Sequence, residues 1–178
     1  MNSNTPFDAM FSGVIGQEYD LLKLICPFAT EMSRLVGAKL GEIASAQGQP
    51  VQVVELGGGT GITTLAILSA HADLRVLSID NEPTMQRQAQ QSLNSWVNQG
   101  RLSFSGDDAL TALANMPDGS VDAIGSAYTL HNFESGYRER VIQEIFRVLK
   151  PGAWFVNGDR YALDDIDAHT RATQQEVA

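Results

Sequence analysis

Residues 51–61 read VQVVELGGGTG, an apolar run that leads directly into a cluster of glycines. The β-branched residues Val51, Val53 and Val54 are typical of a strand that is buried on both faces. Apolar residues recur at helical spacing after Gly61, which predicts an amphipathic helix. A strand, a glycine turn and a helix therefore follow one another. Glycines suit this turn because the backbone must adopt positive φ and let a ligand approach closely.

Two classes of ligand are compatible with such a turn. The dinucleotide fingerprint G-x-G-x-x-G places a pyrophosphate on the helix N-terminus, but Ile62 occupies its third glycine position here. A carboxylate at Glu55 would repel a pyrophosphate, whereas it can accept hydrogen bonds from an ammonium group. The pattern that matches completely is E-x-G-x-G-x-G, formed by Glu55, Gly57, Gly59 and Gly61. A nicotinamide-dependent oxidoreductase is therefore the less favoured reading, and a turn that binds nothing is disfavoured by the number of matched positions.

This pattern resembles motif I of the class I S-adenosylmethionine-dependent methyltransferases. The resemblance implies an α/β three-layer sandwich, with a Rossmann-like, mostly parallel sheet and helices on both faces. It also implies that the turn holds the methionine part of S-adenosylmethionine. The residues assigned to this contact are Glu55, Gly57, Gly58, Gly59 and Gly61.

The next apolar run, residues 74–79, ends in the acidic residue Asp80. Asp80 lies about 20 residues beyond Gly61, the spacing at which an acid reaches a ribose hydroxyl in a βαβ unit. A carboxylate can accept from both ribose hydroxyls at once. We therefore assign Asp80 and the following Asn81 to the cofactor. The alternative role for Asp80 is a helix N-cap, because Pro83 fits the first turn of a helix.

A third strand is predicted at residues 101–105, followed by Gly106, Asp107 and Asp108. This segment resembles the G-D-A segment of the family, in which the acid accepts from the exocyclic amine of adenine. Position relative to the glycine favours Asp107 for this role. Asp108 is a second candidate for the cofactor, or it caps the helix that follows.

The fourth strand and the loop after it are predicted at residues 121–133. In the related enzymes the methyl group and its acceptor meet here, so the resemblance places Ala127 and Tyr128 near the sulfonium. The loop lacks the Asn-Pro-Pro-Tyr sequence used for amide and base nitrogens, which disfavours those acceptors. His131 is the one residue in this loop that can take a proton near neutral pH, so it is the candidate catalytic base. An exposed or structural histidine is the alternative. No metal site is predicted.

The chain is expected to form one domain over residues 1–178, with a core at 51–160. Residues 1–48 are predicted to be mainly helical, and the resemblance implies that they form a lid over the cleft, with Tyr19 near the cofactor. The alternative role for Tyr19 is a core or cap aromatic. Residues 161–178 form a polar tail with helical character. The resemblance implies two further strands for which this sequence offers no candidate. We therefore expect either a fragment of a longer protein or a minimal form whose fifth strand lies at the sheet edge. An open strand edge promotes pairing with another strand. We therefore expect the edge of the fifth strand to be covered by a second copy of the chain in a homo-oligomer, or by the tail.

The composition limits the function classes further. The 178 residues carry a formal net charge of −9, which argues against nucleic acid or an anionic membrane as a partner. No apolar run is long enough to span a bilayer, and the first residues show no secretory signal. A single cysteine, Cys26, excludes an internal disulfide and fits the cytoplasm.

Together these observations predict transfer of a methyl group from S-adenosylmethionine to a small molecule. One alternative is a non-catalytic cofactor-binding or assembly protein with the same fold, which the missing strands would favour. The other is an NAD-dependent oxidoreductase.

Overall fold

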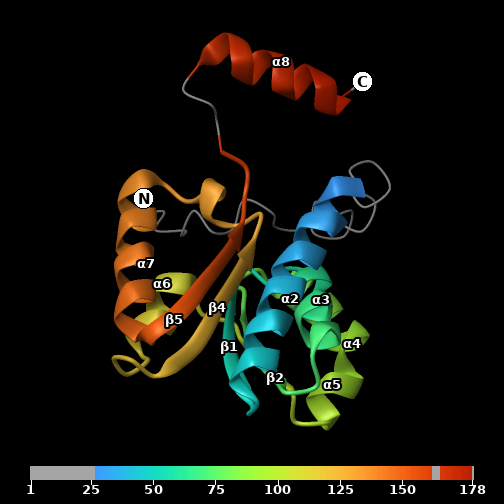
Figure 1. Cartoon of the computed structure of the whole chain (residues 1–178), viewed down its shortest axis with the longest axis vertical. Helices are drawn as coiled ribbons and strands as arrows, with labels where there is room; N and C mark the ends of the chain where they lie inside the picture. The colour runs from blue at the N-terminus through green and yellow to red at the C-terminus, as the bar shows by residue number, and fades with distance from the viewer. Residues whose placement is uncertain (1–26, 162–164, 178) are drawn as a thin grey trace.

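The computed structural model describes residues 27–161 and 165–177, and Figure 1 shows their arrangement. Tyr19 and Cys26 lie outside the described residues. In chain order the elements are α2 (Pro27–Gln47), β1 (Val51–Leu56), α3 (Ile62–Ala70), β2 (Leu74–Ile79), α4 (Pro83–Ser92), α5 (Asn94–Asn98), β3 (Leu102–Ser105), α6 (Ala109–Ala114), β4 (Val121–Ala127), η2 (Leu130–Asn132), α7 (Ser135–Val148), β5 (Leu149–Gly158) and α8 (Ile166–Val177).

The five strands form one sheet in the order β3-β2-β1-β4-β5, and every neighbouring pair is parallel. Strand β1 is central: Val53 pairs with Val76 of β2 on one side and with Ala123 of β4 on the other. Helices α6 and α7 pack on one face of the sheet, while α2, α3 and the α4–α5 region cover the other (Figure 1). The predicted three-layer α/β sandwich is confirmed. The strand order reverses next to β1, where such folds bind ligands.

Helix α2 is part of this core. Its residues Val36, Leu40 and Ala44 are buried in the same apolar cluster as β1, β2 and α3. A Cβ added at Gly37 would lie 2.6 Å from the backbone of Ala66 in α3, so the backbones of α2 and α3 are in close contact there. Residues 27–47 therefore pack as a core helix, and the expected lid over residues 1–48 stays a prediction. Periodicity in the sequence identifies an amphipathic helix but does not say whether its apolar face covers a sheet or a cleft.

Apolar residues at helical spacing predict a helix over residues 138–150, with Pro151 and Gly152 as its stop, but the structure ends this helix earlier. Helix α7 ends at Val148, and β5 begins at Leu149, which pairs with Val121 of β4. The predicted stop at Pro151 and Gly152 therefore lies inside a strand, where the register with β4 shifts and Gly152 has φ +79°. A strand accepts proline at such an irregularity when it lies at the sheet edge, because its N–H side needs no partner there.

Strand β5 has no partner on its outer side within the described part of the chain. Trp154 of β5 is 54% exposed, and Phe146 of the neighbouring α7 is 86% exposed. The predicted helical character of the tail is confirmed by α8. None of the described helices is both long enough and apolar enough to cross a membrane.

Candidate functional site: a cleft at the carboxyl ends of the strands

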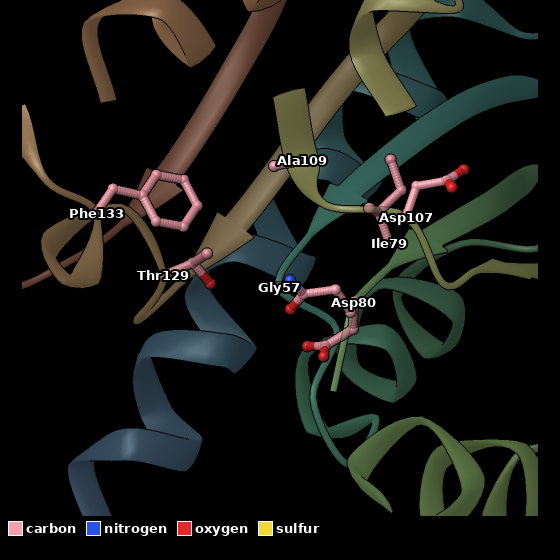
Figure 2. Close-up of a pocket in the computed structure, with 8 residues that line it drawn as sticks. Gly57, Ile79, Asp80, Asp107, Ala109, Thr129 and Phe133 are labelled. Atoms are coloured by element: carbon pink, nitrogen blue, oxygen red, sulfur yellow. The ribbon is translucent and has the colours of Figure 1, made fainter. Parts of the chain in front are cut away.

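A shallow cleft, open to solvent, lies at the carboxyl ends of the strands on the α6 side of the sheet. Figure 2 shows Asp80 and Asp107 on one side of this cleft, Thr129 and Phe133 on the other, and Gly57 between them. The residues that line it are Gly57, Ile79, Asp80, Asn81, Asp107, Ala109, Thr129 and Phe133. Four of these were predicted from the sequence as cofactor ligands, namely Gly57, Asp80, Asn81 and Asp107.

The glycine turn is held against the end of β2. The amides of Gly57 and Gly58 donate to the carbonyl of Ile79 at 2.9 and 3.2 Å. Gly57 has φ +71°, and a Cβ there would lie 2.1 Å from Oγ1 of Thr129. A Cβ at Gly58 would lie 1.9 Å from Oγ of Ser78. Side chains are therefore excluded by space at both positions, and at Gly57 by backbone conformation as well. Of the four glycines, only Gly57 lines the cleft.

Asp80 fixes the shape of this turn. Its Oδ2 accepts a hydrogen bond from the Gly59 amide at 2.7 Å, and its Oδ1 accepts from the Glu82 amide at 2.8 Å. Burial raises the pKa of Asp80, the two amide donors oppose this, and the nearby charge of Glu82 adds to it. Each carboxylate oxygen has two lone pairs, so acceptor capacity is left for a ligand in the cleft. The N-cap of α4 is Glu82, whose side chain accepts from the Met85 amide.

Glu55 lies beneath the turn, outside the residues that line the cleft, and is fully buried. Its Oε2 accepts a hydrogen bond from Thr64 at 2.6 Å, while its Oε1 has no hydrogen-bond partner among the described residues. Burial raises the pKa of Glu55 to about 7, hydrogen bonds from Thr64 and Ser78 oppose this, and the charge of Asp80 adds to it. Direct contact between Glu55 and a cofactor stays a prediction. The structure establishes a buried carboxyl group under the glycine turn.

The adjacent residues Asp107 and Asp108 have different surroundings. Asp107 lines the cleft and accepts a hydrogen bond from Ser105 Oγ at 2.9 Å. Asp108 is the N-cap of α6: it accepts from the Leu110 and Thr111 amides, both at 3.1 Å, and from the Tyr137 hydroxyl at 2.8 Å. Burial alone would raise the pKa of Asp108, but these hydrogen bonds together lower it. Of the two roles weighed for Asp108, the structure shows the helix cap.

The loop after β4 supplies the opposite wall through Thr129 and Phe133. Tyr128 adopts φ +53°, and its amide donates to the Gly158 carbonyl at 2.9 Å. His131 contacts the carboxylate of Asp159 through its ring Nδ1. Three predicted residues of this region, Ala127, Tyr128 and His131, are not among those that line the cleft. Their assigned roles stay predictions.

The sequence reasoning did not assign four residues of the cleft, which are Ile79, Ala109, Thr129 and Phe133. Each lies within two residues of a residue that was singled out. The available signal was the rule that ligands bind outside the carboxyl ends of the strands in such sheets. Applied to every strand end, this rule includes Ile79 and Thr129. No group of three or more potential metal ligands occurs in the part of the chain that the structure describes.

Comparison with known families gives a match to the family described as "Methyltransferase domain", over residues 53–152. This segment contains β2, β3 and β4, most of β1, the glycine turn and every residue of the cleft. The chain belongs to the methyltransferase-domain family. The resemblance to class I methyltransferases inferred from Glu55 and the glycines is thereby confirmed.

Curated relatives of this methyltransferase domain include the demethylmenaquinone methyltransferase of Leptospira interrogans. It is 31% identical over 109 residues, which cover 61% of this chain and 43% of the relative. The carboxy-S-adenosyl-L-methionine synthase of Klebsiella pneumoniae is 24% identical over 130 residues, which cover 71% of this chain and 51% of the relative. The chain thus spans about half the length of the curated relatives that it matches.

Solved structures share the fold of this methyltransferase domain at low sequence identity. A putative S-adenosyl-L-methionine-dependent methyltransferase from Methanococcus maripaludis gives a TM-score of 0.67 at 16% identity, covering 99% of this chain and 74% of that one. The magnesium protoporphyrin IX methyltransferase of Synechocystis, solved with bound SAM, gives a TM-score of 0.64 at 15% identity. It covers 84% of this chain and 74% of that one.

Proposed function

We propose that this cleft binds S-adenosylmethionine and that the chain catalyses transfer of its methyl group to a small-molecule acceptor. The observation that carries the proposal is the arrangement of Asp80, which braces the glycine turn through the Gly59 amide and still faces the cleft. Asp107 lies on the same side, and the loop of Thr129 and Phe133 closes the other. The family match supports the proposed chemistry, and one curated relative is a carboxy-S-adenosyl-L-methionine synthase.

In this proposal Asp80 accepts from the ribose hydroxyls and Asp107 accepts from the adenine amine, as their acceptor capacity permits. The turn at Gly57 lies against the methionine part. Bound S-adenosylmethionine supplies a sulfonium methyl group that is already activated for displacement. The task of the protein is then to hold donor and acceptor in line and to exclude water, which can lower a barrier by about 7–11 kcal/mol.

The charges beneath the turn fit a ligand that carries positive charge. Glu55, Asp80 and Glu82 are all buried or nearly so, and the charge of one raises the pKa of the next. A cation in the cleft would offset this mutual repulsion, whereas a pyrophosphate would add to it. The buried Oε1 of Glu55, which has no hydrogen-bond partner among the described residues, is one of the oxygens of these three buried acids.

The test is isothermal titration of the purified chain with S-adenosylhomocysteine, the stable product, and with NAD as the competing ligand. We expect S-adenosylhomocysteine to bind and NAD not to bind. Asp107→Ala should weaken binding about tenfold, because a hydrogen bond to a charged group is lost. Glu139→Ala, which changes an exposed acid on α7, is the matched control and should leave the affinity unchanged. A folded chain that binds NAD alone would refute the proposal.

Turnover decides between an enzyme and a binding protein. Binding of S-adenosylhomocysteine without methyl transfer to any member of a broad acceptor panel would favour the non-catalytic alternative. The proposal includes no nucleic-acid partner, in line with the net charge of −9, and a cytoplasmic location, in line with the single cysteine.

The proposal also includes a homo-oligomer formed through the edge of β5. Its support is the unpaired outer side of this strand, together with the exposed Trp154 and Phe146 on either face of the edge. Exposed edges of this kind pair readily with another chain. Sedimentation velocity over a range of protein concentrations tests it, and a monomer at every concentration would contradict it.

A further inference from the structure

Asp159, the residue directly after β5, has a buried side-chain carboxylate. Its side chain is 0% exposed, although the preceding strand lies at the sheet edge. Its Oδ2 accepts from the backbone amide of His131 at 3.0 Å, and its Oδ1 accepts from the amide of Arg160 at 2.9 Å. Oδ1 also contacts Nδ1 of the His131 ring. One buried carboxylate therefore binds both the backbone and the ring of the same histidine.

This pairing fixes the position of the loop after β4. The Tyr128 amide donates to the carbonyl of Gly158, and the His131 amide donates to Asp159, so two hydrogen bonds attach the loop to the end of β5. The ring of Tyr128 meets the ring of His131 edge-on, with centroids 6.3 Å apart. Thr129 and Phe133, two residues to either side of His131, both line the cleft. The histidine is thus held within the loop whose residues Thr129 and Phe133 line the cleft, although His131 itself is not one of the lining residues.

The contact to Asp159 also decides which ring nitrogen of His131 carries the proton. A carboxylate is an acceptor only, so the nitrogen facing it must be protonated, and the other nitrogen of a neutral ring then holds a free lone pair. The side chain of His131 is 31% exposed, which leaves room for access to that second nitrogen. A buried carboxylate that orients an imidazole in this manner is a common second partner of functional histidines.

We propose that Asp159 is a positioning residue that holds His131 as the Nδ1–H tautomer, with Nε2 available to accept a proton from a hydroxyl-bearing methyl acceptor. This inference rests on the proposed function for the identity of the reaction. In the step, the acceptor oxygen forms a bond to the methyl carbon of the sulfonium donor. The carbon–sulfur bond breaks and its electron pair stays on sulfur. The proton of the acceptor hydroxyl passes to Nε2 of His131.

The chain contains its own reference for the test. In His71, Nδ1 accepts a hydrogen bond from the Asp73 amide at 3.2 Å, so a neutral His71 carries its proton on Nε2. His71 and His131 are therefore expected to be opposite tautomers in one sample. Long-range ¹H–¹⁵N spectra of ¹⁵N-labelled protein distinguish the two forms, at an alkaline pH where the imidazole is neutral. The sequence has three histidines, and loss of one signal set in His131→Gln assigns His131.

The expected result in the wild-type chain is Nδ1–H for His131 and Nε2–H for His71. In Asp159→Asn the amide oxygen takes the backbone donors and the NH₂ group faces the ring, so His131 should change to the Nε2–H form. Asp73→Asn, beside His71, is the matched control and should change neither ring, because the hydrogen bond to His71 comes from the backbone amide of residue 73, while its carboxylate lies 3.8 Å from Nδ1. A wild-type His131 in the Nε2–H form would overturn the proposal, whether or not Asp159→Asn folds. A His131 tautomer unaffected in a folded Asp159→Asn would overturn it as well.

The spectra are recorded with and without S-adenosylhomocysteine, so that the two proposals fail separately. Absence of S-adenosylhomocysteine binding in the wild-type chain counts against the proposed function, while the tautomer of the free protein still tests the role of Asp159. Asp159→Asn should alter the affinity for S-adenosylhomocysteine by less than about threefold, which is under 1 kcal/mol, because Asp159 does not line the cleft.

Discussion

The two walls of the cleft differ in how firmly the rest of the protein holds them. On the wall formed by β1 and β2, the glycine turn is fixed by backbone hydrogen bonds to Ile79 and by the buried carboxylate of Asp80. On the wall formed by the loop after β4, Thr129 donates to the Leu56 carbonyl of β1, while the amides of Tyr128 and His131 donate to the end of β5, a strand with an open edge. The first wall is an extension of the core. The second depends in part on β5, a strand with no partner on its outer side within the described residues.

This difference matches a division of labour in the proposed reaction. A cofactor shared by many proteins needs the same buried turn each time, and that turn can be built into the centre of the sheet. An acceptor differs from protein to protein, so the wall that faces it is made of loops, which tolerate change. We therefore expect substitutions on the first wall to affect stability strongly, and those on the second to affect mainly chemistry and association.

The largest effect is expected for Gly57→Ala. The new Cβ would meet Thr129 across the cleft and would hold a positive φ, so we expect a loss of about 2–5 kcal/mol in unfolding free energy. Gly48→Ala is the matched control, since Gly48 also has positive φ but no atom within 4 Å of a new Cβ, and it should lose only about 1 kcal/mol. Urea unfolding measures both. Equal losses would mean that the two walls are not in close contact at Gly57.

The next effect concerns the pH dependence of stability. Because the pKa of Glu55 is raised to about 7 in the folded chain, the native state binds more protons than the unfolded state between its ordinary pKa and about 7. Stability should therefore fall by roughly 3 kcal/mol as pH rises through this window, on account of Glu55 alone. Asp80, whose pKa is also raised, contributes in the same direction.

Glu55→Gln removes the contribution of Glu55 to the pH dependence of the unfolding free energy. Urea unfolding at several pH values should show that the variant gains stability relative to the wild type as pH rises, and that the gain levels off above the pKa of Glu55. The exposed Glu139→Gln serves as control, with an unchanged slope. A constant difference between Glu55→Gln and the wild type across the pH range would mean that Glu55 is not desolvated.

A smaller effect separates the neighbours Asp107 and Asp108. Asp108→Ala removes the N-cap of α6 and the hydrogen bond to Tyr137, for an expected loss of about 1–2 kcal/mol in thermal or urea unfolding. Asp107→Ala should change stability by no more than about 0.5 kcal/mol. In titrations with S-adenosylhomocysteine, Asp107→Ala should instead lose more affinity than Asp108→Ala. A larger loss of affinity in Asp108→Ala would show that the cap is also the cofactor ligand.

The smallest effect on stability is expected at the open edge. Phe146→Ser replaces an exposed side chain of α7, so the unfolding free energy of the monomer should change by no more than about 0.5 kcal/mol. If the edge mediates association, this variant should nevertheless sediment as a smaller species than the wild type at the same concentration. Unchanged sedimentation of an oligomeric wild type would place the interface elsewhere.

Much of the first wall could be predicted from the sequence because its residues obey local rules. A valine-rich run, glycines that allow positive φ, and an acid at the end of the next strand each restrict the backbone or the chemistry within a few residues. These rules identified the strand that became β1 and the cleft residues Gly57, Asp80 and Asp107. The same kind of local rule left two roles open for Asp108, because caps and ligands use the same carboxylate.

The tertiary structure decided what depends on residues far apart in the chain. Glu55 lies beneath the turn rather than in the cleft, and this depth follows from the way α3 and β2 pack around it. The pairing of Leu149 with Val121 turned the predicted end of α7 into the beginning of β5, since strand pairing outweighs the local preference of a few residues. Asp159 meets His131 only because β4 and β5 are adjacent strands.

The sequence by itself therefore determined the order of the strands and helices and the family of the domain, because hydrophobic period and turn chemistry act over short distances. The burial of each acid, the role of α2 in the core and the partner of His131 came from the fold. These properties depend on which segments pack together, and packing is decided by the whole chain at once.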